Sequence, residues 1–265
     1  MPKPIILIKI GGSLITDKTK QNSIKQKALT TICQEIKKAS KLGKKLIIGH
    51  GAGSFAHFPA QKYQTHKGII SSQSEKGIAI VADVACQLNR IIIRQLIETG
   101  VNAVSVSPLA MMTANNHQLS NICTHSLEEI LKLDLLPVVY GDQIIDEKIG
   151  CTIFSTEKVL GYLALELKNK DYQIERIIHC GQTNGVYDEK GNTIPFINSH
   201  NYQKYKKSLT GSNGVDVTGG MLHKVEETLA LAKKGIPGLI IDGIEHGSLS
   251  KAIAGEKVLG TIIDK

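Results

Sequence analysis

The sequence predicts an α/β fold, a three-layer α/β/α sandwich around a mainly parallel sheet. Short apolar runs alternate along the chain with segments in which apolar residues recur at every third or fourth position. The run at residues 5–10 is apolar except for Lys9, which is typical of a strand buried on both faces of a parallel sheet. Alternating strands and helices favour a layered sheet with right-handed crossovers.

The individual elements follow from the same two patterns. Apolar runs place strands at residues 5–10, 45–48, 101–106, 135–140, 174–180, 239–242 and 260–263. Helical spacing places helices at about residues 23–42, 74–99, 127–132, 156–168 and 249–253, with another that ends at about residue 234. In the long helix at 74–99, one apolar face is formed by Ile78, Val81, Ala85, Leu88 and Ile92.

Composition limits the class of protein. A chain of 265 residues suffices for one large domain or two small ones, and 42% of the residues are hydrophobic. No apolar run reaches the roughly 18 residues of a membrane span, and the N-terminus lacks the pattern of a signal peptide. The five cysteines are scattered without a CxxC pair, which favours reduced thiols in a cytoplasm.

The charge balance favours an anionic partner. Lysine and arginine number 32 against 24 acidic residues, a formal net charge of 32 − 24 = +8. Aromatic residues make up only 4% of the chain, and no stripe of basic and aromatic residues is present. Small acidic molecules such as phosphates therefore fit the charge as well as nucleic acid does, and nucleic acid is not the expected partner.

A glycine-rich turn within residues 46–57 gives the first local indication of a site. Its apolar run is followed by Gly49, Gly51, Gly53, Ser54 and His57. Where a buried strand passes through glycines into a helix, bare backbone N–H groups can bind an anion. Glycine-rich turns also occur for packing alone, so this stretch by itself does not establish a phosphate site.

Other strand ends and helix starts offer similar groups. They are Lys9 with Gly11 and Gly12, Gly141 with Asp142, and Gly219 and Gly220 with Lys224. Phosphoryl transfer requires fixed cations and backbone N–H groups around the transferred group more than a covalent nucleophile. The chain lacks the GxxxxGK[ST] motif and has no cluster with metal-ligand spacing, so neither a P-loop nor a protein metal site is expected.

The segments Lys9-Ile-Gly-Gly-Ser13, His50-Gly-Ala-Gly-Ser-Phe-Ala-His57, Gly141-Asp142 and Asp216-Val-Thr-Gly-Gly-Met221 with Lys224 resemble the amino acid kinase family. Within it, Thr16-Asp17-Lys18 and the histidine that closes the second loop resemble the isopentenyl phosphate kinases. The resemblance implies one amino acid kinase domain over residues 1–265. Its acceptor-binding lobe would span about 1–165 and its nucleotide-binding lobe about 166–265. It also implies ATP and Mg²⁺ as cofactors, isopentenyl phosphate as acceptor and a homodimer.

The resemblance assigns roles to particular residues. Lys9 and Lys224 would stabilise the transferred phosphoryl group, Lys18 would reach the ATP phosphates, His57 would bind the acceptor's phosphate, and Asp142 would organise the lysines. The glycines Gly11, Gly12, Gly51 and Gly53 would donate backbone N–H groups. ATP would be bound by Lys9, Gly11, Gly12, Ser13, Lys18, Gln182, Gly185, Asp216, Gly219, Gly220 and Lys224. The acceptor would be bound by Gly51, Ala52, Gly53, Ser54, His57, Ile78, Ala82 and Gly141.

Three departures from the family pattern leave alternatives open. Ala52 and Ala56 replace glycines in the second loop, which is tolerable only where φ stays negative. Gly181 to Gly185 lacks the usual acidic residues near the nucleotide, and Glu157 stands where an aspartate is common. The residues Gln182, Asn184 and Glu157 motivate the alternative hypothesis of a nucleotide-binding protein with degraded catalysis. A kinase of another small phosphate or phosphonate, such as fosfomycin, is a further alternative.

Small residues on the helix at 74–99 suggest a deeper acceptor pocket. Relatives often carry aromatic or long side chains there, whereas this chain has Ile78, Ala79, Ala82, Ala85 and Cys86. We expect prenyl phosphates longer than five carbons to be accepted if these residues line the pocket. Packing against a neighbouring helix explains the same small residues equally well.

Overall fold

A mainly parallel sheet of eight strands forms the centre of the molecule, and it contains the seven strands predicted from the apolar runs together with the short strand β10 (Phe196–Ile197). The computed structural model of the chain describes residues 3–17, 19–210 and 220–265. Neighbouring strands are parallel throughout this sheet except for β11 and β12, which are antiparallel. In spatial order the strands are β10 (Phe196–Ile197), β12 (Gly260–Ile263), β11 (Gly238–Asp242), β9 (Ile174–Gly181), β1 (Ile5–Ile10), β2 (Lys45–His50), β6 (Leu136–Tyr140) and β3 (Ala103–Ser105).

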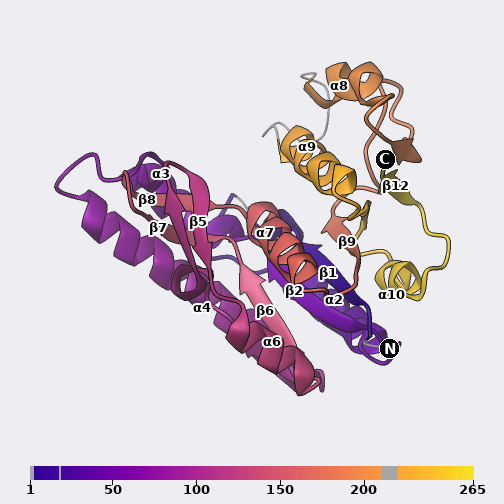
Figure 1. Cartoon of the computed structure of the whole chain (residues 1–265), viewed down its shortest axis with the longest axis horizontal. Helices are drawn as coiled ribbons and strands as arrows, with labels where there is room; N and C mark the ends of the chain where they lie inside the picture. Colours follow the sequence, from indigo (N-terminus) through magenta and orange to yellow (C-terminus); the bar gives the residue numbers. More distant parts are fainter. Residues whose placement is uncertain (1–2, 18, 211–219) are drawn as a thin grey trace.

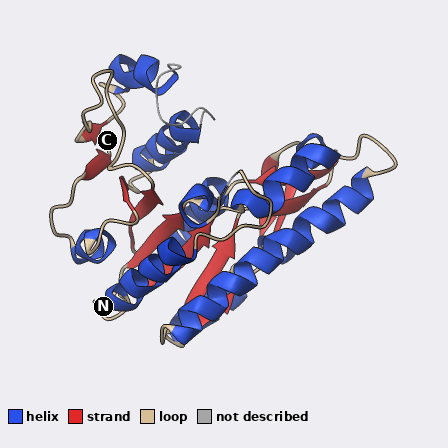
Figure 2. Cartoon of the chain, turned by 180° about the vertical axis from the view of Figure 1, so that it is seen from behind, coloured by secondary structure: helices blue, strands red, loops and turns tan. Residues whose placement is uncertain are grey.

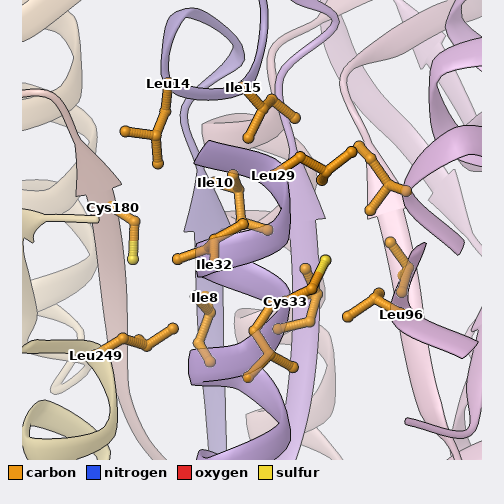
Figure 3. Packing of buried hydrophobic residues seen from close by; sticks show 14 of the residues in the cluster. Ile8, Ile10, Leu14, Ile15, Leu29, Ile32, Cys33, Leu96, Cys180 and Leu249 are labelled. Atoms are coloured by element: carbon orange, nitrogen blue, oxygen red, sulfur yellow. The ribbon is translucent and has the colours of Figure 1, made fainter. Parts of the chain in front are cut away.

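The helices cover both faces of this sheet, so the predicted sandwich is confirmed. Ile6, Ile8 and Ile10 of β1 pack on one side, where Figure 3 shows Ile8 and Ile10 beside α2. Ile5 and Leu7 pack on the other side, against α7. The helices are α1 (Gly12–Ile15), α2 (Gln26–Ala39), α3 (Gly53–Tyr63), α4 (Ser74–Glu98), α5 (Pro108–Met111), α6 (His125–Lys132), α7 (Thr156–Asn169), α8 (Tyr202–Thr210), α9 (Gly220–Lys233), α10 (Ser248–Ala254) and the 3₁₀ turn η1 (Thr65–Lys67).

The two ends of the chain's fold are separated by the central strands. In Figure 1, α3, α4 and the strands β5, β7 and β8 gather at one end, and α8, α9 and β12 gather at the other. The view from behind in Figure 2 shows the same two groups, with the long helix α4 along one edge. The carboxyl ends of β1 and β2 lie between them, which is where ligands bind in open parallel sheets.

A second sheet of four strands was not predicted from the sequence. Its strands are short and mix polar with apolar residues, so they carry no strong period-two pattern. In spatial order they are β5 (Gln118–Ile122), β4 (Met112–Asn115), β7 (Asp142–Asp146) and β8 (Gly150–Phe154). This sheet carries Asp142, Ile153 and Phe154 to the candidate site described below.

The predicted element positions hold with shifts of a few residues at the ends. The helix expected at 23–42 spans Gln26–Ala39, while α4 ends one residue before the expected position. Among the described residues, no helix is both long and apolar enough to cross a bilayer. All five cysteines are free thiols, of which Cys86 and Cys123 are exposed.

Candidate active site

A cavity of about 520 Å³ opens at the carboxyl ends of β1 and β2 and receives residues from both ends of the fold. It brings together most of the residues expected to form the site. From the sequence-based set, the lining includes Lys9, Gly11, Gly12, Ser13, Gly51, Ala52, Gly53, His57, Gly141, Asp142, Gln182, Gly220 and Lys224. The volume suits a small ligand in a largely preformed site.

Four expected site residues lie away from this lining. Ser54 is fully buried and its hydroxyl contacts the backbone of Ser23. Gly185 is buried at φ +120°, beside the hydroxyl of Thr261. The remaining two, Ile78 and Ala82, are half-buried on α4 and do not line the cavity. Lys18, Asp216 and Gly219, which were also expected in the site, lie outside the described residues.

Lys9 is held by Glu157 rather than by Asp142. Side chains alternate along β1, so Lys9 projects to the same face as Leu7, where α7 begins. Its Nζ lies 2.6 Å from Oε1 of Glu157, and the two side chains are only 11% and 17% exposed. Burial raises the pKa of Glu157, but the charge and hydrogen bond of Lys9 outweigh it and bring the pKa to about 2. Glu157 therefore contacts the lysine through a side chain that is one methylene longer than that of the usual aspartate.

Asp142 has a different environment from the one expected. Its carboxylate accepts a hydrogen bond from the N–H of Gln143 at 2.8 Å and a longer one from Leu109 at 3.4 Å. The residue is 3% exposed, and burial raises its pKa to about 7. The expectation that Asp142 organises the lysines is thus wrong for Lys9, whose carboxylate partner is Glu157.

The first glycine loop follows β1 and contains Gly11 and Gly12, and the second follows β2 and contains Gly51 and Gly53; their backbones are in direct contact. A Cβ on Gly12 would lie 2.6 Å from the nitrogen of Gly53, and one on Gly51 would lie 2.8 Å from the nitrogen of Gly12. Gly53 also has φ +51°, and its Cβ would fall 2.1 Å from the hydroxyl of Thr16. That hydroxyl donates to the carbonyl of Gly12 and accepts from the N–H of Ser54. The glycines are therefore required by close approach of the loops.

Only some of the expected backbone donors are available to an anion. The N–H of Gly11 donates to Cys180 and that of Gly51 donates to Ile10. Among the described residues, no internal acceptor is recorded for the N–H groups of Gly12, Ala52 and Gly53, all of which line the cavity. Ala52 has φ −71°, a negative value at which its methyl group is accommodated.

Lys224 lies on α9 and lines the cavity with Lys9, and its backbone carbonyl contacts a buried pair formed by Thr228 and His179. Thr228 donates its hydroxyl proton to the carbonyl of Lys224 at 2.6 Å, so it accepts from Nε2 of His179 at 3.0 Å. In the sheet, His179 is paired with Lys9. Burial lowers the pKa of His179 to about 3, so the ring is neutral and adds no charge beneath the two lysines.

The comparison with known proteins identifies the family. The model of the amino acid kinase family matches residues 4–242. The chain belongs to the amino acid kinase family. The resemblance noted in the sequence and the expected fold are therefore confirmed.

Several relatives of this amino acid kinase match along their whole length. The isopentenyl phosphate kinase of Methanocaldococcus jannaschii is 35% identical over 270 residues, which cover 98% of both chains. That of Methanothermobacter thermautotrophicus is 31% identical over 269 residues, again with 98% of both chains covered. A solved isopentenyl phosphate kinase structure is 28% identical, with a TM-score of 0.81 and coverage of 98% of this chain and 100% of the other.

The apolar wall of the kinase cavity comes from residues that were not expected in the site. It consists of Ala56, Ala60, Val81, Ile153 and Phe154. The last two belong to β8, a strand that carried no clear pattern. From α4, only Val81 is in the lining, so the small residues proposed to deepen the pocket do not reach it. The expectation of longer prenyl substrates thereby loses its structural basis.

Six further lining residues were not among those expected to contact a ligand. They are Ser155, Thr156, Glu157, Gly181, Thr183 and Met221. A possible signal was the Ser-Thr-Glu sequence at a helix start: Ser155 caps α7 by accepting from the N–H of Lys158, and Thr156 bonds to the carbonyl of His50.

The donor set of this kinase fits a magnesium ion that arrives with its nucleotide. Across residues 3–17, 19–210 and 220–265, no three acidic, histidine or cysteine side chains form a metal-binding group. Among the described residues, the carboxylates in the cavity lining are Asp142, bonded to backbone N–H groups, and Glu157, bonded to Lys9. Mg²⁺ commonly takes phosphate oxygens and waters with few protein ligands, which is compatible with this set.

Proposed function

We propose that this amino acid kinase transfers the γ-phosphoryl group of ATP to isopentenyl phosphate, giving isopentenyl diphosphate and ADP. The observation that carries the proposal is the make-up of the cavity. Cations and glycine N–H groups lie beside a short apolar wall formed by α3, α4 and β8. An acceptor with a phosphate at one end and a small hydrocarbon group at the other would use both parts.

The lysines supply the charge that phosphoryl transfer needs. Lys9 and Lys224 come from different halves of the chain and both line the cavity, so they can contact the transferred group from two sides. Glu157 fixes the ammonium group of Lys9, and Lys224 adds a second cation to the lining. Mg²⁺ held by the nucleotide would neutralise phosphate oxygens.

His57 is proposed to bind the acceptor's phosphate. It lies one helical turn beyond Gly53 on α3 and lines the cavity with Ala56 and Ala60 of the same helix. An imidazole beside an anion gains proton affinity and can donate a charge-assisted hydrogen bond. This helix would therefore provide both the phosphate contact and part of the apolar wall.

We also propose that the two substrates are bound by different parts of the chain. Residues of about 1–165 would form the acceptor lobe and residues of about 166–265 the nucleotide lobe, including Gln182, whose side chain bonds to Ser13 of the first glycine loop. Lys18, Asp216 and Gly219 keep their proposed nucleotide contacts. We further propose a cytoplasmic homodimer, which light scattering after size exclusion would test through the mass of the particle.

Phosphorus NMR with ATP, Mg²⁺ and isopentenyl phosphate tests the reaction, with fosfomycin in a parallel sample. The expected result is a new pair of diphosphate resonances with isopentenyl phosphate alone. Turnover of fosfomycin alone would replace the acceptor, and silence in both samples would contradict the kinase proposal. In that last case, calorimetry with ATP would distinguish a nucleotide-binding protein that has lost catalysis.

A further inference from the structure

His50 is a buried histidine that the proposed reaction does not use. It is the last residue of β2, and alternation turns its side chain to the face that carries α4, away from Lys9 and Glu157. The ring is fully buried and stacks on Tyr140, with ring centroids 5.5 Å apart and planes inclined by 19°. A histidine without solvent contact must satisfy both ring nitrogens within the protein or leave one unpaired at a cost.

Its neighbours define one tautomer. Nδ1 lies 3.3 Å from the carbonyl oxygen of Gly51, which can only accept, so Nδ1 carries the proton. Nε2 is then an acceptor, and the amide nitrogen of Asn89 lies 3.1 Å from it. Asn89 belongs to α4 and is itself fully buried. Burial also lowers the pKa of His50 to about 4, which keeps the ring neutral in this tautomer.

The bond to Gly51 has a consequence at the next residue. In a planar trans peptide the carbonyl and the following N–H point in opposite directions. Because the Gly51 carbonyl is directed at the His50 ring, the Ala52 N–H is directed away from it. Ala52 lines the cavity, and its N–H is one of the groups without a recorded acceptor among the described residues.

The same histidine also joins the Gly51–Ala52 peptide to α4, the helix that contributes Val81 to the cavity wall. Its partner Asn89 lies eight residues after Val81, about 12 Å along the helix axis. The backbone carbonyl of His50 also accepts from the N–H of Gly141 at 3.1 Å and from the hydroxyl of Thr156 at 2.8 Å. One residue therefore connects the second glycine loop with α4, with the turn before β7 and with the start of α7.

We propose that His50 is a positioning residue that directs the Ala52 N–H toward the acceptor's phosphate and, through Asn89, fixes the apolar wall of α4 relative to that N–H. The identity of the acceptor rests on the proposed function, whereas the orientation of the N–H toward an anion does not. The hydrogen-bonded pair of His50 and Asn89 thereby links the part of the site that would contact the ligand's phosphate to the part that would contact its hydrocarbon group.

Matched substitutions at position 50 test the proposal. His50→Phe keeps the ring and its stacking but removes both hydrogen bonds. His50→Asn places an amide N–H where Nδ1 was. We expect the phenylalanine variant to raise KM for isopentenyl phosphate about tenfold while KM for Mg-ATP stays within about twofold. The asparagine variant should recover most of the loss. Equal acceptor KM in wild type and both variants, or a parallel rise in both KM values, would overturn the proposal.

A spectroscopic experiment separates this inference from the reaction itself. Nitrogen-15 NMR of the wild-type histidine rings should find the His50 proton on Nδ1, and Asn89→Leu should release the ring to a mixture of tautomers. Titration with inorganic phosphate should shift the Ala52 amide resonance in wild type and much less in His50→Phe. A proton on Nε2, or equal shifts in both proteins, would refute the proposal even if isopentenyl phosphate proves not to be the acceptor.

Discussion

The ammonium group of Lys9 lies 2.6 Å from a carboxylate oxygen of Glu157, a residue 148 positions away in the chain. β1 supplies the cation and the first turn of α7 supplies the anion. Glu157 stays ionised because its pKa is about 2, as the attraction of Lys9 outweighs the effect of burial. The pair therefore holds Lys9 Nζ at one place on the cavity wall.

Replacing Glu157 with glutamine tests this positioning. The substitution keeps the shape but removes the charge that holds Lys9, so we expect kcat to fall by about a hundredfold and the thermal midpoint to fall as well, because the buried ammonium group loses its counter-charge. Glu157→Asp keeps the charge on a shorter arm and should give an intermediate kcat. Steady-state kinetics with thermal melts of each variant provide the measurement. Full turnover by Glu157→Gln would show that the ion pair has no part in catalysis.

Removal of the lysines should separate catalysis from stability. Lys9→Met and Lys224→Ala should each reduce kcat by about 10²–10³. Lys9→Met leaves Glu157 charged and poorly exposed, which should lower the free energy of unfolding by about 1–3 kcal/mol. The double variant Lys9→Met/Glu157→Gln should regain most of that stability and none of the activity. Urea unfolding measures the stability of each variant. A double variant as unstable as Lys9→Met would show that the unpaired charge of Glu157 does not cause the loss.

The general position of the site could be predicted from the sequence because parallel strands deliver their carboxyl ends to one edge. Lys9 lies near the end of one apolar run, Gly12 and Gly51 follow apolar runs, and the structure brings all three to one cavity. What could not be predicted is which carboxylate reaches a given lysine. Asp142 follows a strand directly, but its carboxylate bonds to backbone N–H groups, whereas Glu157 begins a helix on the face to which Lys9 points.

The second sheet was missed for a physical reason. Its β4–β5 turn is made by Asn116 and His117 at φ 51° and 68°, without the glycine that usually marks such a hairpin. The carboxylate of Asp146 accepts from both of their N–H groups, at 3.0 and 2.7 Å, and so supports the turn from another strand. A contact between distant segments replaces the local signal, and pattern analysis has no access to it.

The contact between the glycine loops predicts the effect of one added methyl group. Gly12→Ala would place a Cβ 2.6 Å from the backbone nitrogen of Gly53, so the loops must separate. We expect a loss of about 2 kcal/mol in stability and weaker ATP binding. Gly161→Ala in α7 is the control, since its Cβ would meet Leu231 at an ordinary 3.6 Å and favours the helix. Urea unfolding and calorimetry with ATP give the two readouts; equal behaviour of both variants would contradict the loop contact.

The apolar wall predicts how acceptor length is selected. Val81 is the α4 residue that reaches the lining, beside Ala56 and Ala60 of α3. Val81→Ala should raise kcat/KM for geranyl phosphate relative to isopentenyl phosphate by about tenfold, since two methyl groups are worth about 1–2 kcal/mol of apolar contact. Ala82→Gly on the same helix is the control, because Ala82 does not line the cavity. A preference that is unchanged by Val81→Ala would exclude α4 from length selection.

Asp142 predicts an unusual pH dependence of stability. Burial raises its pKa in the folded protein to about 7 from the ordinary 3.8. Between these values the folded state binds more protons at this group than the unfolded state does. The contribution of Asp142 to the free energy of unfolding must therefore fall as pH rises from about 4 to about 7, and then level off.

Asp142→Asn isolates that contribution. The variant keeps the shape of the side chain but cannot ionise, so its stability relative to wild type should increase by on the order of 3 kcal/mol between pH 4 and pH 8. Asp188→Asn is a control of opposite sign. Backbone hydrogen bonds from Asn192 and Lys190 lower the pKa of Asp188, so removal of its charge should cost stability as pH rises. Urea unfolding at several pH values, with a carbon-13 titration of the Asp142 carboxyl group, measures both effects. A carboxyl midpoint near 4 would show that Asp142 is ionised at neutral pH in spite of its burial.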